Sequence, residues 1–158
     1  MSVREMMPAP DASGANFCVL AARWNEADVR RMVDAALEAL RNQGASEASL
    51  ELRWVSGSYE LPVAAKWAAE SGRFDAVLAF GVVLRGETEH FRLVADAASE
   101  GLMRVMLDTG VPVLNGVLAA YDRAQVEARS GGKLGNIGKE VALAAALMVQ
   151  HRRQAEVQ

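Results

Sequence analysis

The sequence predicts an α/β fold in which a four-stranded parallel sheet is covered by helices on both faces. Apolar runs of strand length alternate along the chain with longer segments in which apolar residues recur every three or four positions. Each of the four predicted strands is followed by a predicted helix, an order that favours right-handed crossovers and a parallel sheet. These observations together indicate a three-layer, flavodoxin-like sandwich.

The composition fits a single domain. The chain has 158 residues, 51% of them hydrophobic, and a net charge of -3 without the basic stripe that nucleic acid or an anionic membrane surface needs. The single cysteine, Cys18, excludes an internal disulfide and fits a reducing compartment. No apolar run reaches the ~18 to 20 residues of a membrane helix, and no signal peptide is recognisable. We expect a cytoplasmic protein that binds neither nucleic acid nor membrane.

The N-terminal part is predicted to differ from the rest. Residues 1–15 contain two prolines and several small polar residues, so they form an extended arm that is ordered only when something else holds it. The folded domain comprises residues 16–158. Its first strand covers the apolar residues 17–22.

The first helix is predicted over residues 29–40, where apolar residues have the spacing of one helix face. Asn25 with Asp28 offers an N-terminal cap, and Gly44 ends the helix. A second strand over residues 50–54 shows alternating apolar and polar residues.

The second half of the domain repeats the same units. Pro62 begins a helix that runs to residue 71, because its missing N–H is not needed there. The continuous apolar run of residues 76–83 is typical of a central strand that is covered on both faces. The remaining elements are a helix over residues 91–106, a strand over 111–118, and helices over 122–129 and 137–151.

Four loops are predicted at the edge where the strands end. In open parallel sheets, ligands bind beyond the carboxyl ends of the strands. The loops contain residues 23–25, 56–60, 85–90 and 118–122. Trp24, Glu60 and His90 are therefore expected to converge although they lie far apart in the sequence.

The segment RGETEH has the features of an anion site. Gly86 permits close approach to the backbone, Thr88 adds a hydroxyl, and the first N–H groups of the following helix are unpaired. His90 lies in that first turn, where the helix dipole favours a neutral imidazole that can accept a proton. The alternative is a capping Thr88 and a surface histidine without a ligand.

Other candidates also have two interpretations. Trp24 follows a strand where it could stack on a planar heterocycle or pack in the core. Glu60 could accept hydrogen bonds from a polyol or cap a helix, and Arg129 could clamp a phosphate or be solvated. Trp54 and Trp67 are expected at packing positions.

Two kinds of site are not predicted. GGKLGN is neither a Walker A loop nor a GxGxxG fingerprint after a strand. Without a cluster of Cys and His, a metal site is not expected.

The residues of these loops resemble one family, lumazine synthase, the penultimate enzyme of riboflavin biosynthesis. The resemblance runs from about residue 17 to 148. Its markers are ARWN from residue 22, VSGSYELP from residue 55, GVVLRGETEHF from residue 81, GLMRV from residue 101, PVLNGVL from residue 112 and ARSGGKLGNIG from residue 128. RGETEHF and GSYELP in this order are highly specific together.

The resemblance implies a condensation of 5-amino-6-ribitylamino-pyrimidinedione with 3,4-dihydroxy-2-butanone 4-phosphate to 6,7-dimethyl-8-ribityllumazine, a transferase reaction without a metal or redox cofactor. His90 would be the catalytic proton carrier. The implied substrate-binding residues are Trp24, Ser58, Tyr59, Glu60, Val82, Val83, Leu84 and Asn115. The implied phosphate-binding residues are Gly86, Glu87, Thr88 and Arg129.

The resemblance also implies assembly. Family members form pentamers with the site between neighbouring subunits, and many assemble twelve pentamers into a hollow shell. Arg129 and Asn115 would then come from the neighbouring subunit. The arm of residues 1–15 would add a strand to the sheet of a neighbour.

Four positions depart from the family pattern. Family members often carry Phe where Asn115 stands, Thr at Ala119, Lys at Ile137 and Pro at Ser56. The change at Ile137 removes a cation near the reacting groups. These departures motivate one alternative, a catalytically weakened or engineered homologue that serves as a self-assembling shell or scaffold. A second alternative is a module that binds flavin or lumazine, since the same pocket would accept a product-like ring.

Overall fold

The computed structural model describes residues 3–5 and 8–157. Its main sheet has four strands that all run parallel, in the order β2-β1-β3-β4. Their bounds are β1 (Phe17–Ala22), β2 (Leu50–Val55), β3 (Ala76–Leu84) and β4 (Val113–Ala120). The predicted parallel sheet is confirmed.

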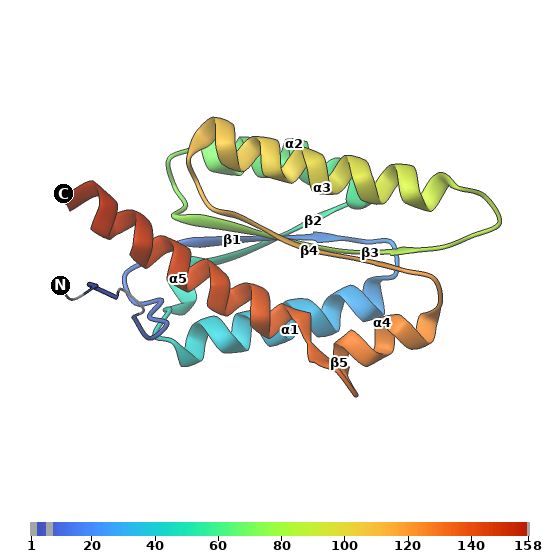
Figure 1. Ribbon diagram of the computed structural model, residues 1–158, viewed down its shortest axis with the longest axis horizontal. Coiled ribbons are helices and arrows are strands. Elements are labelled where there is room, and N and C mark those ends of the chain that lie inside the picture. Colours follow the sequence, from blue (N-terminus) through green and yellow to red (C-terminus); the bar gives the residue numbers. More distant parts are fainter. Residues whose placement is uncertain (1–2, 6–7, 158) are drawn as a thin grey trace.

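Helices cover both faces of this sheet (Figure 1). The α-helices are α1 (Glu26–Asn42), α2 (Leu61–Glu70), α3 (His90–Thr109), α4 (Arg123–Arg129) and α5 (Ile137–Val157), and the 3-10 turns are η1 (Glu47–Ser49) and η2 (Ser58–Glu60). Helices α2 and α3 lie on one face, and α1, α4 and α5 on the other. Within the described part of the chain, no helix combines the length and apolar character needed to cross a membrane.

The core consists of two apolar clusters, one on each face of the sheet. Strand β1 is buried on both faces, and β3 is buried except for its last residue, as expected of central strands. Cys18 of β1 is fully buried and unpaired, and burial raises the pKa of its thiol to about 11. Cys18 is therefore the small core residue that its apolar surroundings predict.

Several predicted boundaries were wrong. The fourth strand begins at Val113 instead of residue 111, because pairing with β3 starts there, and the Pro112 carbonyl accepts a hydrogen bond from Val77. Helices α3 and α5 both extend beyond their predicted ends. The glycine-rich connection contains an unpredicted antiparallel hairpin, with strands β5 (Ser130–Gly132) and β6 (Gly135–Asn136).

The predicted cap of α1 was also wrong. Neither side chain caps the helix, which begins at Glu26. Asn25 adopts the left-handed conformation with φ 61°, which asparagine tolerates, and its amide donates to the carbonyl of Val82 at 3.0 Å. Asn25 therefore ties the loop after β1 to strand β3.

The prediction for two tryptophans was half correct. Trp54 packs against the cluster beneath α1 and α5. Trp67 is 66% exposed, because the buried stripe of α2 consists of Leu61 and small alanines on the opposite side of the helix. Trp67 thus lies on the outer surface of the sandwich.

Part of the N-terminal arm is held by its own chain. Ala12 is fully buried, and its N–H donates to the carbonyl of Gln43 at 2.7 Å. The side chain of Gln150 donates to the carbonyl of Ala9 and accepts from the N–H of Asp11. Addition of the arm of residues 1–15 to a neighbouring subunit stays a prediction, and residues 1–2 and 6–7 lie outside the described residues.

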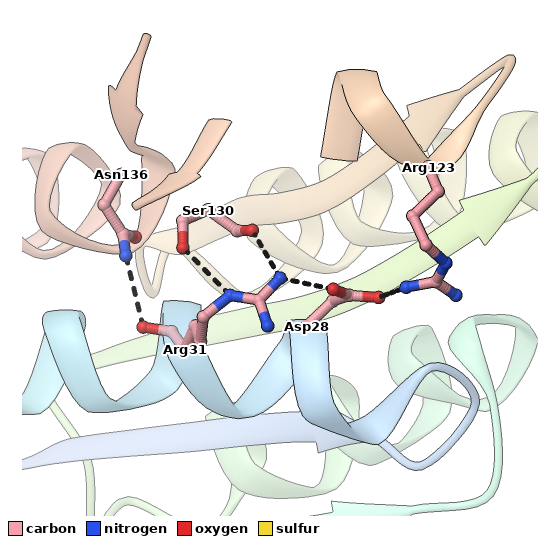
Figure 2. A network of polar contacts seen from close by, with 5 residues as sticks. All are labelled: Asp28, Arg31, Arg123, Ser130 and Asn136. Atoms are coloured by element: carbon pink, nitrogen blue, oxygen red, sulfur yellow. Dashed lines mark hydrogen bonds and ion pairs between the residues drawn. The ribbon is translucent and has the colours of Figure 1, made fainter. Parts of the chain in front are cut away.

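A network of polar contacts joins α1 to α4 and to the hairpin (Figure 2). Asp28 is only 2% exposed, and its two carboxylate oxygens pair with Arg31 and Arg123. Arg31 also donates to the carbonyl and hydroxyl oxygens of Ser130, while Asn136 donates to the carbonyl of Arg31. The buried carboxylate therefore fixes the segment that carries Arg129.

We predict that Asp28→Asn destabilises the protein by about 1–3 kcal/mol, because a buried acceptor of two charge-assisted hydrogen bonds loses its charge. The free energy of unfolding is measured by denaturant titration at one protein concentration. Asp34→Asn is the matched control, since Asp34 is exposed on the same helix. Equal stability of the two variants would contradict a structural role for the network.

Candidate active site

A cavity of about 810 Å³ opens at the carboxyl edge of the sheet. Loops after β1, β2 and β3 reach this edge, on the right in Figure 1. The lining residues are Trp24, Asn25, Gly57, Ser58, Tyr59, Glu60, Val82, Val83, Leu84, Gly86, Thr88, His90, Phe91, Leu93 and Val94. The cavity thus brings together Trp24, Glu60 and His90 from three loops.

Trp24 stands at the mouth of the cavity. Its side chain is not part of the core, since the residue is 75% exposed. The preceding β1 residues are fully buried, so the chain leaves the core immediately before the indole. The core-packing interpretation of Trp24 was therefore wrong, and a planar indole face is available for a ligand.

The turn η2 is in close contact with strand β3. A Cβ atom on Gly81 would lie 2.2 Å from Oγ of Ser58 and 3.4 Å from Cδ1 of Leu61. Ser58 is 5% exposed, so it has little room to move away. Only glycine at position 81 lets η2 approach the strand this closely.

Glu60 does not cap helix α2. The residue occupies the N-cap position, but its side chain makes no capping hydrogen bond. Its Oε1 instead accepts a hydrogen bond from the hydroxyl of Ser56 at 2.6 Å. The capping interpretation was wrong, and the carboxylate lines the cavity.

One edge of β3 is open toward the cavity. Pairing with β1 ends at Phe80, whereas pairing with β4 continues to Leu84. Because backbone groups of a strand point alternately to its two sides, some groups of residues 81–84 face the space beyond β1. At this open edge, the side-chain amide of Asn25 donates a hydrogen bond to the carbonyl of Val82.

The loop between β3 and α3 leads directly into a long helix. Helix α3 has 20 residues and begins at His90, without a side-chain cap. Thr88 precedes the N-cap residue, and its hydroxyl accepts a hydrogen bond from the N–H of His90 at 3.3 Å. Gly86 has open space around its Cα, while the exposed Glu87 does not line the cavity.

The loop after β4 contacts the loop between β3 and α3 but does not line the cavity. The Arg85 guanidinium lies 5.7 Å from the ring centre of Tyr121. The ring of Tyr121 also meets Phe91 edge-on at 6.1 Å. Tyr121 therefore contacts both ends of the loop, a role that no local sequence pattern indicates.

Besides Glu87, two more predicted site residues lie outside the cavity of their own chain. Arg129 is the last residue of α4 and is exposed, and its guanidinium donates to the Gln125 carbonyl at 3.5 Å. Asn115 is exposed on β4, where its side chain contacts Ser99 and the N–H of Val117. A role of either residue in the site of a neighbouring subunit stays a prediction.

Cations are missing from the cavity wall. Among the described residues that line it, none is lysine or arginine. Ile137 begins α5 and packs, partly buried, against the core. In the described part of the chain, no three His, Cys, Asp or Glu side chains are grouped closely enough to hold a metal ion.

Sequence comparisons give a consistent result. The family model for 6,7-dimethyl-8-ribityllumazine synthase matches residues 14–153. A 6,7-dimethyl-8-ribityllumazine synthase of Stenotrophomonas maltophilia (strain R551-3) is 48% identical over 135 residues, which cover 85% of this chain and 87% of that protein. A protein of the same name from Xanthomonas oryzae pv. oryzae (strain PXO99A) is 47% identical over 135 residues, with 85% and 88% covered.

We predict that Gly81→Ala destabilises the protein by about 1–3 kcal/mol, because the new methyl group overlaps Ser58. The added variant Ser58→Ala removes the overlapping oxygen and should restore part of the stability. Unfolding of the two single variants and the double variant measures the coupling between the positions. Additive effects would contradict the close contact of η2 with β3.

Proposed function

The chain belongs to the 6,7-dimethyl-8-ribityllumazine synthase family, and we propose how its cavity carries out the reaction of that family. It is a transferase-type enzyme that condenses 5-amino-6-ribitylamino-pyrimidinedione with 3,4-dihydroxy-2-butanone 4-phosphate. The product is 6,7-dimethyl-8-ribityllumazine, with loss of phosphate and water. The observation that carries the proposal is that Trp24, Glu60, Thr88 and His90, from three separate loops, line one cavity.

The pyrimidine ring binds between Trp24 and the open edge of β3. The exposed indole stacks on the ring, which is planar and poorly hydrated on its faces. Backbone groups of the segment Val82 to Leu84 that face the open edge then hydrogen-bond to the ring edge, beside the Val82 carbonyl that accepts from Asn25. The early end of the pairing with β1 supports this placement.

The ribityl chain extends over the turn η2. Ser58, Tyr59 and Glu60 line that part of the cavity. A carboxylate accepts strong hydrogen bonds from hydroxyl groups, and Glu60 is not engaged as a helix cap. Glu60 is therefore the main acceptor for the polyol.

The phosphate of the second substrate binds at the start of α3. Gly86, Glu87 and Thr88 supply backbone N–H groups and a hydroxyl next to the positive end of a long helix. Arg129 supplies the missing cation, and Asn115 a part of the ring wall, both from a neighbouring subunit. The absence of Lys and Arg among the described lining residues supports this division.

His90 transfers protons between the two substrates. Imine formation and phosphate loss each need a group that accepts and returns a proton. His90 lines the cavity beside Thr88, at the boundary of the proposed ring and phosphate sites. The proposed reaction uses no metal or redox cofactor.

The working form is a homo-oligomer, which we propose to be a pentamer or a shell of sixty subunits in the cytoplasm. Large apolar side chains are exposed on the outer sides of α2 and α3, where a monomer would leave them in water. They are Val63, Trp67, Met103 and Leu107. Contacts between subunits through this layer would cover them.

The alternative of a catalytically weakened shell or scaffold receives no support from the comparisons. It rested on Ile137 and Asn115, and a packing role for Ile137 is compatible with catalysis. A module that only binds flavin or lumazine would bind without turnover, so the assay below also separates that interpretation.

We predict that the protein forms 6,7-dimethyl-8-ribityllumazine from the two substrates well above the uncatalysed rate, followed by lumazine absorbance or fluorescence. His90→Ala should lower kcat by about 10²- to 10⁴-fold, as expected for a general acid-base residue, and leave pyrimidine binding largely intact. A much smaller loss would mean that proximity of the substrates carries most of the rate. No product above background would refute the enzyme activity.

We predict that Arg129→Ala raises the KM of the phosphorylated substrate and leaves pyrimidine affinity unchanged. At concentrations of the phosphorylated substrate far below the KM of Arg129→Ala, mixed oligomers of equal amounts of Arg129→Ala and His90→Ala chains should regain up to about a quarter of the wild-type activity. Random assembly in a ring pairs an intact His90 with a neighbour's intact Arg129 at that frequency. If Arg129 served its own chain's site, mixing the chains would restore nothing.

A further inference from the structure

The hydroxyl group of Ser56 is the hydrogen-bond donor to Glu60 in this cavity. Ser56 Oγ donates to Oε1 of Glu60 at 2.6 Å, across the first residues of the turn η2. Among the described residues, this is the single hydrogen bond made by the Glu60 side chain, and no ion pair adds to it. Oε2 keeps its full capacity to accept.

The glycine between these residues brings the carboxylate beside Trp24. A Cβ atom on Gly57 would lie 3.2 Å from Cδ1 of Trp24 and 3.6 Å from Oε1 of Glu60. The carboxylate that Ser56 holds therefore lies near the indole at the cavity mouth. A ring stacked on Trp24 would place its side chain within reach of Glu60.

We propose that Ser56 is a positioning residue for the polyol chain of the pyrimidine substrate, an inference that rests on the proposed function of the cavity. The Ser56 hydroxyl fixes one rotamer of Glu60 by occupying Oε1. Oε2 then accepts a hydrogen bond from a ribityl hydroxyl. The Glu60 side chain is already ordered, so it loses no further rotamer freedom on binding. Pre-ordering of this kind increases affinity, since the entropy of a free glutamate is not lost on binding.

A purely structural role for Ser56 makes different predictions. Ser56 follows strand β2 and is exposed, so it could serve only to shape the loop. A stiffer residue such as proline would then serve equally well. A donor role requires a hydroxyl group, which threonine has and proline and alanine lack.

The experiment titrates the full-length protein with the ribitylamino pyrimidine in the absence of the second substrate. Ser56→Ala and Ser56→Pro should both weaken binding about threefold to tenfold, because the Glu60 side chain then has to be ordered on binding. Ser56→Thr keeps the hydroxyl donor and stays near wild type. In turnover, the pyrimidine KM rises by the same factor, and kcat and the KM of the phosphorylated substrate stay within about twofold.

Two controls isolate the polyol contact. The pyrimidine with a methylamino group in place of the ribitylamino chain should bind equally to wild type and Ser56→Ala. In a Glu60→Ala background, Ser56→Ala should have no further effect, as expected when two residues act as one unit. Unchanged affinity in Ser56→Ala, retained affinity in Ser56→Pro, or an equal loss for the methylamino compound would each overturn the proposal.

The outcome is separable from that of the proposed function. A wild-type protein that binds the ribitylamino pyrimidine but forms no lumazine refutes the enzyme activity, and the titrations still decide the role of Ser56. A protein that forms lumazine with unchanged affinity in Ser56→Ala refutes only the positioning role. A wild-type protein that does not bind the ribitylamino pyrimidine refutes both.

Discussion

The contact between Ser58 and Gly81 is the constraint on which the cavity depends. The side chain of Ser58 lies directly against the backbone of β3, where Gly81 has no Cβ atom. The same turn carries Glu60, which lies near Trp24, and pairing of β3 with β1 ends at Phe80 beside it. A larger residue at position 81 would require Ser58 or the turn to shift. The missing Cβ atom of Gly81 is thus one condition for the observed position of η2 in the cavity wall.

The parallel sheet explains why distant residues meet, and for this reason their meeting could be predicted. Continuous apolar runs identify the central strands, and all loops after parallel strands open at one edge. The convergence of Trp24, Glu60 and His90 follows from this topology without knowledge of any contact. Exact boundaries could not be predicted in this way. The shift of β4 to Val113 depends on its register against β3, which only the folded pair defines.

Residues whose role depends on a distant partner were misinterpreted or missed. Asp28 resembles a helix-capping residue in the sequence, but its burial depends on Arg123, which is 95 positions away. Asn25 likewise bonds a strand 57 positions away instead of its own helix. Glu60 and Ser56 are only four residues apart, yet no periodic pattern distinguishes a carboxylate that accepts from a hydroxyl from one that caps a helix. The rotamer of the Glu60 side chain determines which of these two interactions forms, and that rotamer depends on the backbone and on packing in the folded protein.

The charges of the cavity wall argue that one chain does not make a complete site. A phosphate group carries close to two negative charges, and a helix N-terminus offers only about half a positive charge. Glu60 adds a further negative charge, and no lysine or arginine is present among the described lining residues. Arg85 does not compensate, because its guanidinium lies over Tyr121.

The balancing cation has to come from outside the cavity of this chain. In the proposed function, the exposed Arg129 at the end of α4, next to the segment that the Asp28 network holds, supplies this cation to the site of a neighbouring subunit. Assembly is a condition of phosphate binding in that proposal.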